Sequence, residues 1–498
     1  MTYSPPNVRK FEKLSKKSTL LTQNEKVIIL IIAFLFYGVK ELKMKITKDL
    51  TEGNIYKNFL IYAMPILLSS MLSQMYTTVD GMIAGKFISE YALGAISSTG
   101  SFDTLFRSLF RGFAAGFSIY IARLFGKKDY HSLKKDILGV SAFISFLSVC
   151  IALLAIIFRN PILDYLQVDP ILRRDAEIYF VIHTAGFVFY FLDLLLGRIL
   201  YALGVTSFAL YISFFAALLN IGGNLLSVLV LDIGVAGLAI STLISAAFSM
   251  TVYVYLIRKA FKELNCENQK FSFSLACISS SLRYTLPAAL QQLAFHGISF
   301  LIAPSINGIG ADASTGYNVS NRIYNICAQS LWAATEPVTF YVAQCAGKGD
   351  ANKIRRGFKV GILMNCLMIL PFVLSVGIFA KPIISLFFPA GYEGLAFRYV
   401  FRYATIYLGF LYVQMIGHLI HSYMRSLGSV TVVLWITLAG SFTRVVATLW
   451  LVALIGMDGV YIGQIISWAI DAIISLVIYY SRYRTNEHIA LRLERKKH

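Results

Sequence analysis

Twelve long apolar runs dominate this chain of 498 residues and limit what it can fold into. Each run is long enough, at roughly 20 residues or more, to cross the ~30 Å hydrocarbon core of a bilayer as a helix. Backbone groups find no water partner in lipid, and the runs lack the alternating pattern of barrel strands, so we expect helices. The predicted spans are 59–84, 92–125, 137–158, 176–203, 205–231, 235–257, 285–307, 314–346, 358–380, 396–427, 429–454 and 460–480.

The second six runs repeat the first six in degraded form. Tyr62 to Pro65 returns as Tyr284 to Pro287, and Tyr120 to Asp129 returns as Tyr341 to Asp350. Hydrophobic residues make up 57% of the chain and charged residues 14%, which excludes a water-soluble globule. The sequence therefore predicts an all-α membrane protein with twelve transmembrane helices in two homologous six-helix lobes around a central cavity.

The repeat also sets the expected domain organisation. We expect Met44 to be the true start of translation, because the apolar stretch before it is too short to span comfortably. The upstream segment would then be a leader or a dispensable surface helix. The predicted parts are a cytoplasmic N-terminal extension at 1–57, an N-lobe at 58–260, an inter-lobe loop at 261–283, a C-lobe at 284–484 and a basic tail at 485–498.

Lys and Arg collect in the loops after spans 2, 6 and 8 and in the C-terminal tail, and all of these lie on one side of the predicted membrane. That side is predicted to be the cytoplasm, so both termini are expected there. The net charge of +19 is thus mainly a topology signal, and we expect no nucleic-acid partner. The lipid bilayer is the expected surrounding, in a cell membrane of bacterial type.

Polar residues inside spans are costly and mark candidate sites. Asp80 lies late in span 1, Asn220 and Asn224 share one face of span 5, and Thr242 lies in span 6. Their oxygens suit Na⁺, and the carboxylate could carry H⁺ instead. The alternatives are that Asp80 lies near the outer interface and that the other three only join helices by hydrogen bonds.

These residues and the repeated motifs resemble the MATE family, the multidrug and toxic compound extrusion transporters, over residues from about 50 to 484. The motifs that carry the resemblance are Pro65, the Val-Asp-Gly-x-x-x-Gly ending at Gly85, the Gly-Lys-Lys-Asp ending at Asp129, the Leu-Gly at 203–204, the Leu-Leu-Asn-x-x-x-Asn ending at Asn224 and the Gly-Val-Ala-Gly at 234–237.

The resemblance implies two six-helix lobes set in a V about a central cavity, and export of organic cations in exchange for H⁺ or Na⁺. It matches Asp80 to the family's span 1 carboxylate, Asn220 to the span 5 Asn and Thr242 to the span 6 hydroxyl. Two features depart from the pattern: Asn224 stands where some members place Asp, and Arg444 answers Asn220 in the second repeat. Asp80 is then the single carboxylate of the matched set.

Five further polar residues are candidates for the substrate cavity. Arg107 lies near the middle of span 2, where Asp103 and Arg111 share its face at a spacing of four residues and can neutralise part of the charge. Asp193 in span 4 is either a salt-bridge partner of Arg107 or a second protonatable group. Glu336 precedes Pro337, so span 8 either bends to contact cargo or only kinks. His296 and Arg444 complete the set; arginines in the cavity would favour a zwitterionic or anionic substrate.

The predicted function is antiport by a monomer, with a cationic, aromatic small molecule as substrate. The chain has 37 Phe and 29 Tyr, and those facing a cavity would suit flat cations. A lipid-linked precursor flippase of the same superfamily is the alternative, and a receptor or scaffold ranks last. No G-x-x-x-x-G-K-[ST] motif occurs, and Cys and His lack metal-ligand spacing, so we predict no enzyme, cofactor or metal, only the coupling ion.

Overall fold

The computed structural model describes residues 46–266, 275–388 and 391–485, and the regular elements in these ranges are helical. The first half contains α3 (Ile55–Ile83), η1 (Ala84–Ile88), α4 (Glu90–Lys127), α5 (Tyr130–Ile157), α6 (Arg159–Tyr165), α7 (Arg173–Ala185), α8 (Phe187–Ala202), α9 (Ser207–Leu229) and α10 (Gly234–Glu263). The second half contains α11 (Leu275–Ile309), α12 (Ala311–Lys348), α13 (Ala351–Ile378), α14 (Ala380–Ser385), α15 (Leu395–Thr405), η2 (Tyr407–Phe410), α16 (Leu411–Ser426), α17 (Val430–Ile455) and α18 (Met457–Arg482).

Each of the twelve predicted spans falls on one of these helices or on a bent pair. By length and apolar composition, eight described helices can each cross a bilayer, and two bent pairs bring the number to ten. The bent pairs are α7–α8, with a 47° bend, and α15–α16, with a 40° bend, and they are the fourth span of each half. The other two predicted spans are α4 and α12, 38 residues each, which carry more polar residues.

Helix ends differ from three of the predicted boundaries. Helix α10 continues to Glu263 and α11 begins at Leu275, so helical residues extend into the predicted inter-lobe loop from both ends. Helix α3 likewise begins inside the predicted N-terminal extension, where the Asn54 side chain accepts hydrogen bonds from two backbone N–H groups of the first turn. The proposed start at Met44 lies outside the described residues.

The repeated Gly-Lys-x-Asp motif forms the same turn in both halves. Lys128 ends α4 and Gly349 ends α12 in the left-handed conformation, with φ of 61° and 77°. In each half the next residue is an Asp whose side chain accepts a backbone N–H of the following helix, Asp129 for α5 and Asp350 for α13. The motif is therefore a paired C-cap and N-cap that turns the chain sharply between two spans.

The glycines of this motif also bring the halves together. A Cβ atom at Gly126 would lie 2.1 Å from the carbonyl oxygen of Gln344, and one at Gly347 would lie 2.2 Å from that of Arg123. Each glycine thus packs against the backbone of the other half, at equivalent positions of α4 and α12. Only residues without a side chain allow helix backbones to approach this closely.

Residues 46–54 form a strap that precedes α3 and crosses between the halves. The backbone N–H of Lys48 donates to the carbonyl of Leu203 at 2.8 Å, in the first half. The N–H of Leu50 donates to Oε1 of Gln344 at 2.9 Å, and Lys348 donates to Asp49 at 2.5 Å, both in the second half. The strap therefore ties the two halves at the end where the Gly126 and Gly347 contacts lie.

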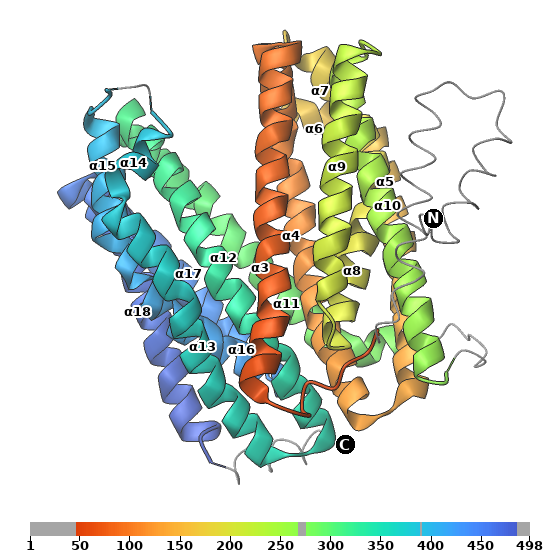
Figure 1. The fold of residues 1–498 in the computed structure, drawn as a ribbon. Helices are drawn as coiled ribbons and strands as arrows, with labels where there is room; N and C mark the ends of the chain where they lie inside the picture. The colour runs from red at the N-terminus through yellow and green to blue at the C-terminus, as the bar shows by residue number, and fades with distance from the viewer. Residues whose placement is uncertain (1–45, 267–274, 389–390, 486–498) are drawn as a thin grey trace, which may run out of the picture. The chain divides into compact units, whose positions relative to one another are not determined.

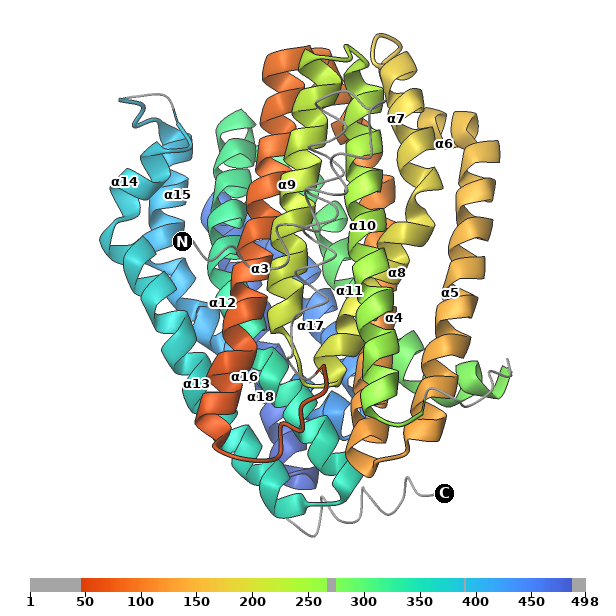
Figure 2. The same cartoon turned by 45° about the vertical axis from the view of Figure 1, so that its right-hand side comes forward.

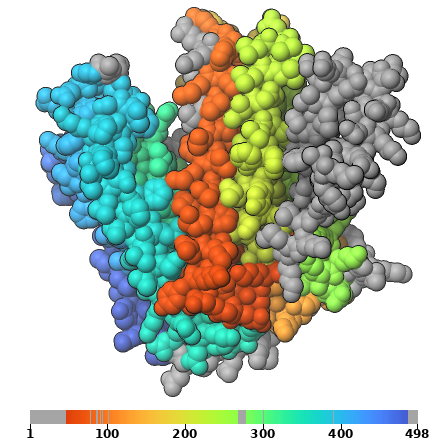
Figure 3. Space-filling view, viewed as in Figure 1, coloured from red at the N-terminus to blue at the C-terminus, as the bar shows by residue number. Residues whose placement is uncertain are grey.

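Within the unit that begins at Ile46, the two helix groups converge at this strapped end. Figure 1 shows the lower ends of α3, α12 and α13 close together, and the upper ends of α3 and of α14–α15 apart. The space-filling view of the same face is notched between the red and cyan residues at the upper end (Figure 3). The core of the second half lies among α11 to α16 and α18, around residues such as Ile302, Leu331 and Tyr461, and α17 packs against it.

Candidate functional site

Asp80 lies near the end of α3, where the helix changes its winding. The backbone N–H of Ala84 donates to the carbonyls of both Asp80 and Gly81, and η1 continues as a π-helical turn. Such turns are rare and often occur at functional sites, because the extra residue shifts side chains relative to the helix axis. This turn could not be predicted from the sequence, since no Pro or Gly pair marks its start.

The four residues predicted to bind a cation come together in the first half. Asn224 Nδ2 donates to Asp80 Oδ1 at 2.6 Å, and the side chains of Asn220 and Thr242 are joined at 3.1 Å. With its amide nitrogen turned toward Asp80, Asn220 lies 2.6 Å from Oδ1 and accepts from Thr242. Helices α3, α9 and α10, which supply these residues, stand side by side in Figures 1 and 2.

Small residues allow α9 and α10 to approach so closely at this site. A Cβ atom at Gly223 would lie 2.8 Å from the hydroxyl of Ser241, and one at Gly237 would lie 2.3 Å from Ser227. An apolar cluster of Ile83, Ala84 and Leu238, with further residues packed on it, lies next to the site. The carboxylate is therefore surrounded by fixed dipoles on one side and hydrocarbon on another.

The chemistry of the Asp80 site is that of a single acid with neutral ligands. Asn220 and Asn224 are almost fully buried, and Asn224 Oδ1 has no hydrogen-bond partner among the described residues. A buried acceptor without a donor costs free energy unless a proton, a cation or water meets it. The Asp80 carboxylate could bind one H⁺, or its oxygens and those of the neutral side chains could coordinate one Na⁺. Among the described ion pairs, none adds a second acid to this site.

A second polar cluster lies in the same half and was only partly foreseen. Arg107 Nε donates to Asp103 Oδ2 at 2.6 Å, and Arg107 Nη2 lies 3.3 Å from His183 Nε2. His183 Nδ1 lies 3.7 Å from Asp103 Oδ1. The rings of Tyr179 and Tyr190 stack on His183, with centroids 5.3 and 4.9 Å away.

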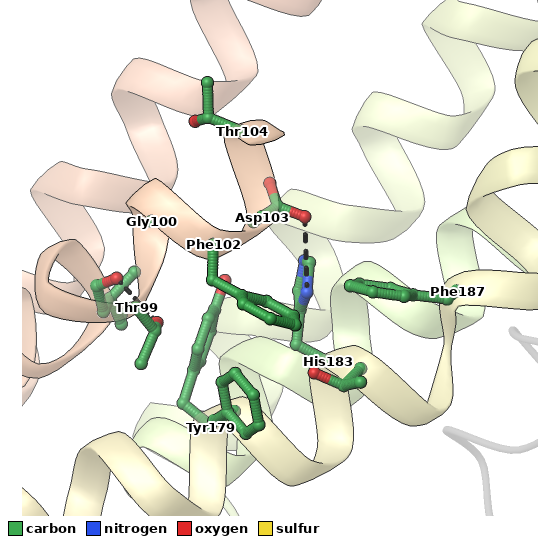
Figure 4. Close-up of a pocket in the computed structure, with 11 residues that line it drawn as sticks. Thr99, Gly100, Phe102, Asp103, Thr104, Tyr179, His183 and Phe187 are labelled. Carbon is green, nitrogen blue, oxygen red and sulfur yellow. Dashed lines mark hydrogen bonds and ion pairs between the residues drawn. The ribbon is translucent and has the colours of Figure 1, made fainter. Parts of the chain in front are cut away.

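A cavity of about 210 Å³ opens beside this cluster. Figure 4 shows the Asp103 carboxylate pointing to His183, with the rings of Phe102, Tyr179 and Phe187 around them. The cavity is lined by Ile96, Thr99, Gly100, Phe102, Asp103, Thr104, Tyr179, Phe180, His183, Thr184 and Phe187. The aromatic walls are suited to a flat organic cation through cation–π contact, whereas the charge of Asp103 is already paired with Arg107.

Sequence reasoning found Asp103 and Arg107 through their spacing but missed His183. Its position in span 4, four residues after Tyr179 and seven before Tyr190, was an available signal for a shared face. The Asp80 site and this cluster are neighbours, because Ile96 lines the cavity and also packs against the apolar cluster of Ile83, Ala84 and Leu238.

Asp193 is not the partner of Arg107 that the sequence suggested. Arg107 pairs with Asp103 on its own helix, because a spacing of four residues places the two side chains on one face. Asp193 lies on α8, and its Oδ1 is buried with no hydrogen-bond partner in the described part of the chain. The second reading of Asp193, as a protonatable group, stays a prediction.

Glu336 lies where the two halves meet. Its Oε1 accepts from Arg198 Nη1 at 2.6 Å, an ion pair between α12 and α8. An arginine near the end of a span usually extends toward the membrane surface, but Arg198 finds its partner in the other half of the chain. Pro337 lies inside α12, which is continuous from Ala311 to Lys348.

The remaining two cavity candidates lie apart from each other. His296 is on α11, which packs against α4 of the first half. Arg444 is on α17, next to Val445, which packs against the core of the second half. Arg444 and Arg107 are therefore in different halves, and no described hydrogen bond or ion pair joins them.

The second half has its own buried acid–base pair. His421 Nε2 lies 3.4 Å from Asp471 Oδ1 and 3.0 Å from the Ser475 hydroxyl, between α16 and α18. Among the described residues, no three His, Cys, Asp or Glu side chains are grouped as metal ligands. The pair does not reproduce the Asp80 site, as the Arg444 position predicts.

Comparisons with known proteins match this architecture. A family model described as MatE matches residues 65–226 and 287–450, one stretch in each half. The probable multidrug resistance protein YpnP of Bacillus subtilis is 22% identical, over 88% of this chain and 97% of its own. The probable multidrug resistance protein YoeA of the same species is 23% identical, over 69% of this chain and 75% of its own.

The fold is also that of a solved structure described as the outward-facing conformation of a multidrug resistance MATE family transporter of the MOP superfamily. The TM-score is 0.80 at 19% identity, covering 89% of this chain and all of the other. The two-lobe, twelve-helix architecture predicted from the sequence is thereby confirmed.

Proposed function

The chain belongs to the MatE family, and on that basis we propose that it exports small molecules, in particular aromatic organic cations, across the cell membrane in exchange for H⁺ or Na⁺. The relatives are described as multidrug resistance proteins, which supports a drug-like substrate. The exchange itself is our inference from the Asp80 site. The protein would act as a transporter and catalyse no covalent chemistry.

The observation that carries this proposal is the Asp80 carboxylate held by neutral partners in a membrane-spanning helix. An ionised acid at such a depth is costly without a positive partner, so it favours binding of a cation. One proton or one Na⁺ would neutralise the site and change the interactions among α3, α9 and α10. Cation binding would thereby favour one arrangement of the first half over another.

Coupling then requires only that the cation and the substrate prefer different arrangements. The halves touch closely at the Gly126 and Gly347 contacts and separate toward the other end, as expected of a protein that opens to one side at a time. A cation entering Asp80 would favour release of the substrate, and the emptied cavity would then close. The ion gradient supplies the direction.

We further propose that the strapped end faces the cytoplasm. The basic loops predicted to be cytoplasmic include Lys127, Lys128 and Lys348, which lie at this end. Both chain termini would then be cytoplasmic in a monomeric protein of a bacterial cell membrane. A lipid-linked precursor flippase stays the second candidate, because arginines gather at the junction of the halves and would suit a phosphate.

The proposal is tested by efflux of rhodamine 123 from energised vesicles under separately imposed H⁺ and Na⁺ gradients. We expect Asp80→Asn to abolish gradient-driven efflux, because the amide cannot carry a proton or balance Na⁺. Asp232→Asn is the matched control, since Asp232 is exposed in the turn before α10. Efflux that survives in Asp80→Asn at equal expression would refute the role of Asp80, and absence of efflux in the unaltered protein would favour the flippase.

A further inference from the structure

Three arginines lie where the two halves meet, near the carboxylate of Glu336. Arg198 on α8 pairs with Glu336 on α12 at 2.6 Å. Arg425 on α16 precedes Ser426, which donates to the carbonyl of Thr339, one turn from Glu336. Arg111 on α4 precedes Gly112, which packs on Ala288, one turn from the Gln291 side chain that accepts from Arg425. We define Arg111, Arg198 and Arg425 as the arginine cluster. Because Glu336 balances only the charge of Arg198, the arginine cluster carries more positive charge than this carboxylate neutralises.

Several buried polar atoms of the arginine cluster and of Glu336 lack a hydrogen-bond partner among the described residues. Arg198 Nε, Arg425 Nε and Glu336 Oε2 are buried, and none has a hydrogen-bond partner within the described ranges. Arg425 Nη1 donates to Gln291 Oε1 at 3.2 Å, which is a neutral acceptor. A guanidinium has five donors arranged to grip an anion, so Arg425 is well suited to one more acceptor.

The cluster is also accessible. The side chains of Arg198 and Glu336 are 22% and 19% exposed, and Arg111 is exposed near the middle of α4. Gly112, the next residue, packs on the backbone of α11 at Ala288. Arg111 therefore lies at the edge of the contact between the halves, and a charge at this depth is tolerated when it lines a watery space.

A lock between the halves would explain only part of this arrangement. The Arg198–Glu336 pair is sufficient for a lock, because one carboxylate neutralises one guanidinium. Arg111 and Arg425 would then add positive charge that the Arg198–Glu336 pair does not balance, and an anion bound between them would offset the repulsion.

We infer that the arginine cluster binds an acidic group of the cargo, a carboxylate or a phosphate. This inference rests on the proposed function and specifies its substrate class as amphoteric molecules. Asp103 and Arg111 lie on α4 with a separation of eight residues, about 12 Å along a helix. An aromatic cation at the Asp103 cavity and an acid at the cluster would thus fit the two ends of one drug-sized molecule.

The experiment compares two dyes that differ in one group. Rhodamine 110 carries a free carboxylate and rhodamine 123 carries its methyl ester, on the same aromatic cation. Binding of each to the purified full-length chain in phosphatidylcholine nanodiscs is followed by fluorescence anisotropy. We expect the free acid to bind about tenfold more tightly, a difference within reach of one charge-assisted contact.

Substitutions then assign the preference to the cluster. Arg425→Gln and Arg111→Gln should each remove most of the preference for rhodamine 110, and Arg425→Lys should restore part of it. Arg258→Gln, at an exposed position of α10, is the matched control and should keep the preference. Binding of rhodamine 123 should persist in all variants, which shows that they are folded.

Equal affinity for the two dyes, weak binding of both, or a preference that survives in Arg425→Gln and Arg111→Gln would each overturn the inference. Gradient-driven efflux of rhodamine 123 can persist in every one of these cases, so the proposed function is judged separately. Adding phosphatidylglycerol to the nanodiscs identifies the source of the acid. Competition by this lipid would favour a phosphate headgroup, and binding without competition a soluble acid; either result supports an acidic ligand at the cluster.

Discussion

Asp80 is held in place by side chains that can each donate or accept without carrying charge. The sequence predicted all four members of this site, partly from residue type and partly from resemblance, and the structure brings them together. It could not predict which atoms meet, because the contacts join three helices far apart in the chain. Whether the site binds a cation stays a prediction.

At the residue scale, Asn224→Ala tests whether the amide next to Asp80 matters. Removing it leaves the carboxylate without a donor at 2.6 Å, and such losses at buried charged groups cost about 1.5–3 kcal/mol. We expect gradient-driven export of rhodamine 123 to fall about tenfold or more. Asn307→Ala, at an exposed position of α11, should leave export unchanged; equal rates for both variants would contradict the account.

Residues that pair across the two halves were the hardest to predict. Arg198 and Glu336 are 138 positions apart, and each alone has an ordinary interpretation, as a charge near a helix end and an acid next to a proline. His183 was missed for the same reason, since its acid partner lies on another helix. The spacing rule worked only within one helix, for Asp103 and Arg107.

Helices were predicted well because hydrophobic length determines them. The bend between α7 and α8 and the π-helical turn after α3 were not, because they depend on packing rather than on composition. In the sequence, the Gly-Lys-x-Asp motif was evident only as a repeat and as part of the family resemblance. Its physical role, capping two helices and allowing close backbone contact, required the structure.

At the element scale, the contact between α4 and α12 should depend on Gly126. Gly126→Ala would place a Cβ atom 2.1 Å from the Gln344 carbonyl oxygen, so the helices must separate. Overpacking of this kind costs about 1–3 kcal/mol, and we expect a lower thermal unfolding temperature in detergent. Gly297→Ala has open space around it and should be neutral or stabilising; a neutral Gly126→Ala would contradict a tight contact.

The strap gives a pH-dependent prediction. Burial opposes ionisation of Asp49, but hydrogen bonds from Lys348 and Thr51 outweigh it and hold the pKa of Asp49 below its usual value of 3.8. A depressed pKa means that the contact stabilises the fold above the unfolded pKa and is lost as the pH falls through the folded pKa. Asp49→Asn should therefore lower thermal stability at pH 7, by no more than about 1 kcal/mol for this partly exposed pair.

The same comparison at strongly acid pH provides the check. Below the folded pKa of Asp49 the carboxyl is protonated, so the variant and the unaltered protein should become equally stable. Asp232→Asn, at an exposed turn position, serves as the control. A difference that persists at acid pH would show that the ion pair is not its cause.

At the scale of the whole molecule, two halves of common origin meet at one end and have diverged in their polar residues. The first half carries the Asp80 site and the Asp103 cavity, whereas the second carries the His421–Asp471 pair. The repeated motifs preserve the turns and the contact between the halves. Duplication thus accounts for the architecture, and the differences between the halves account for the proposed function.

The ion pair between the halves predicts a charge-swap result. Arg198→Glu and Glu336→Arg should each impair export, because each places two like charges together at the junction. The double variant should recover part of the lost export, since the pair is restored with its charges exchanged. If the loss of export in the double variant equals the sum of the losses in the two single variants, the two residues are not coupled at the junction.

Counterflow in vesicles that contain only the purified protein tests the central claim most directly. An outward gradient of rhodamine 123, with no ion gradient imposed, should drive H⁺ or Na⁺ inward. Uptake of H⁺ is measured with an internal pH dye, and uptake of Na⁺ with ²²Na⁺. The account predicts cation uptake that depends on the dye gradient and disappears in Asp80→Asn. Dye movement with neither cation, or equal uptake in Asp80→Asn, would contradict exchange at Asp80.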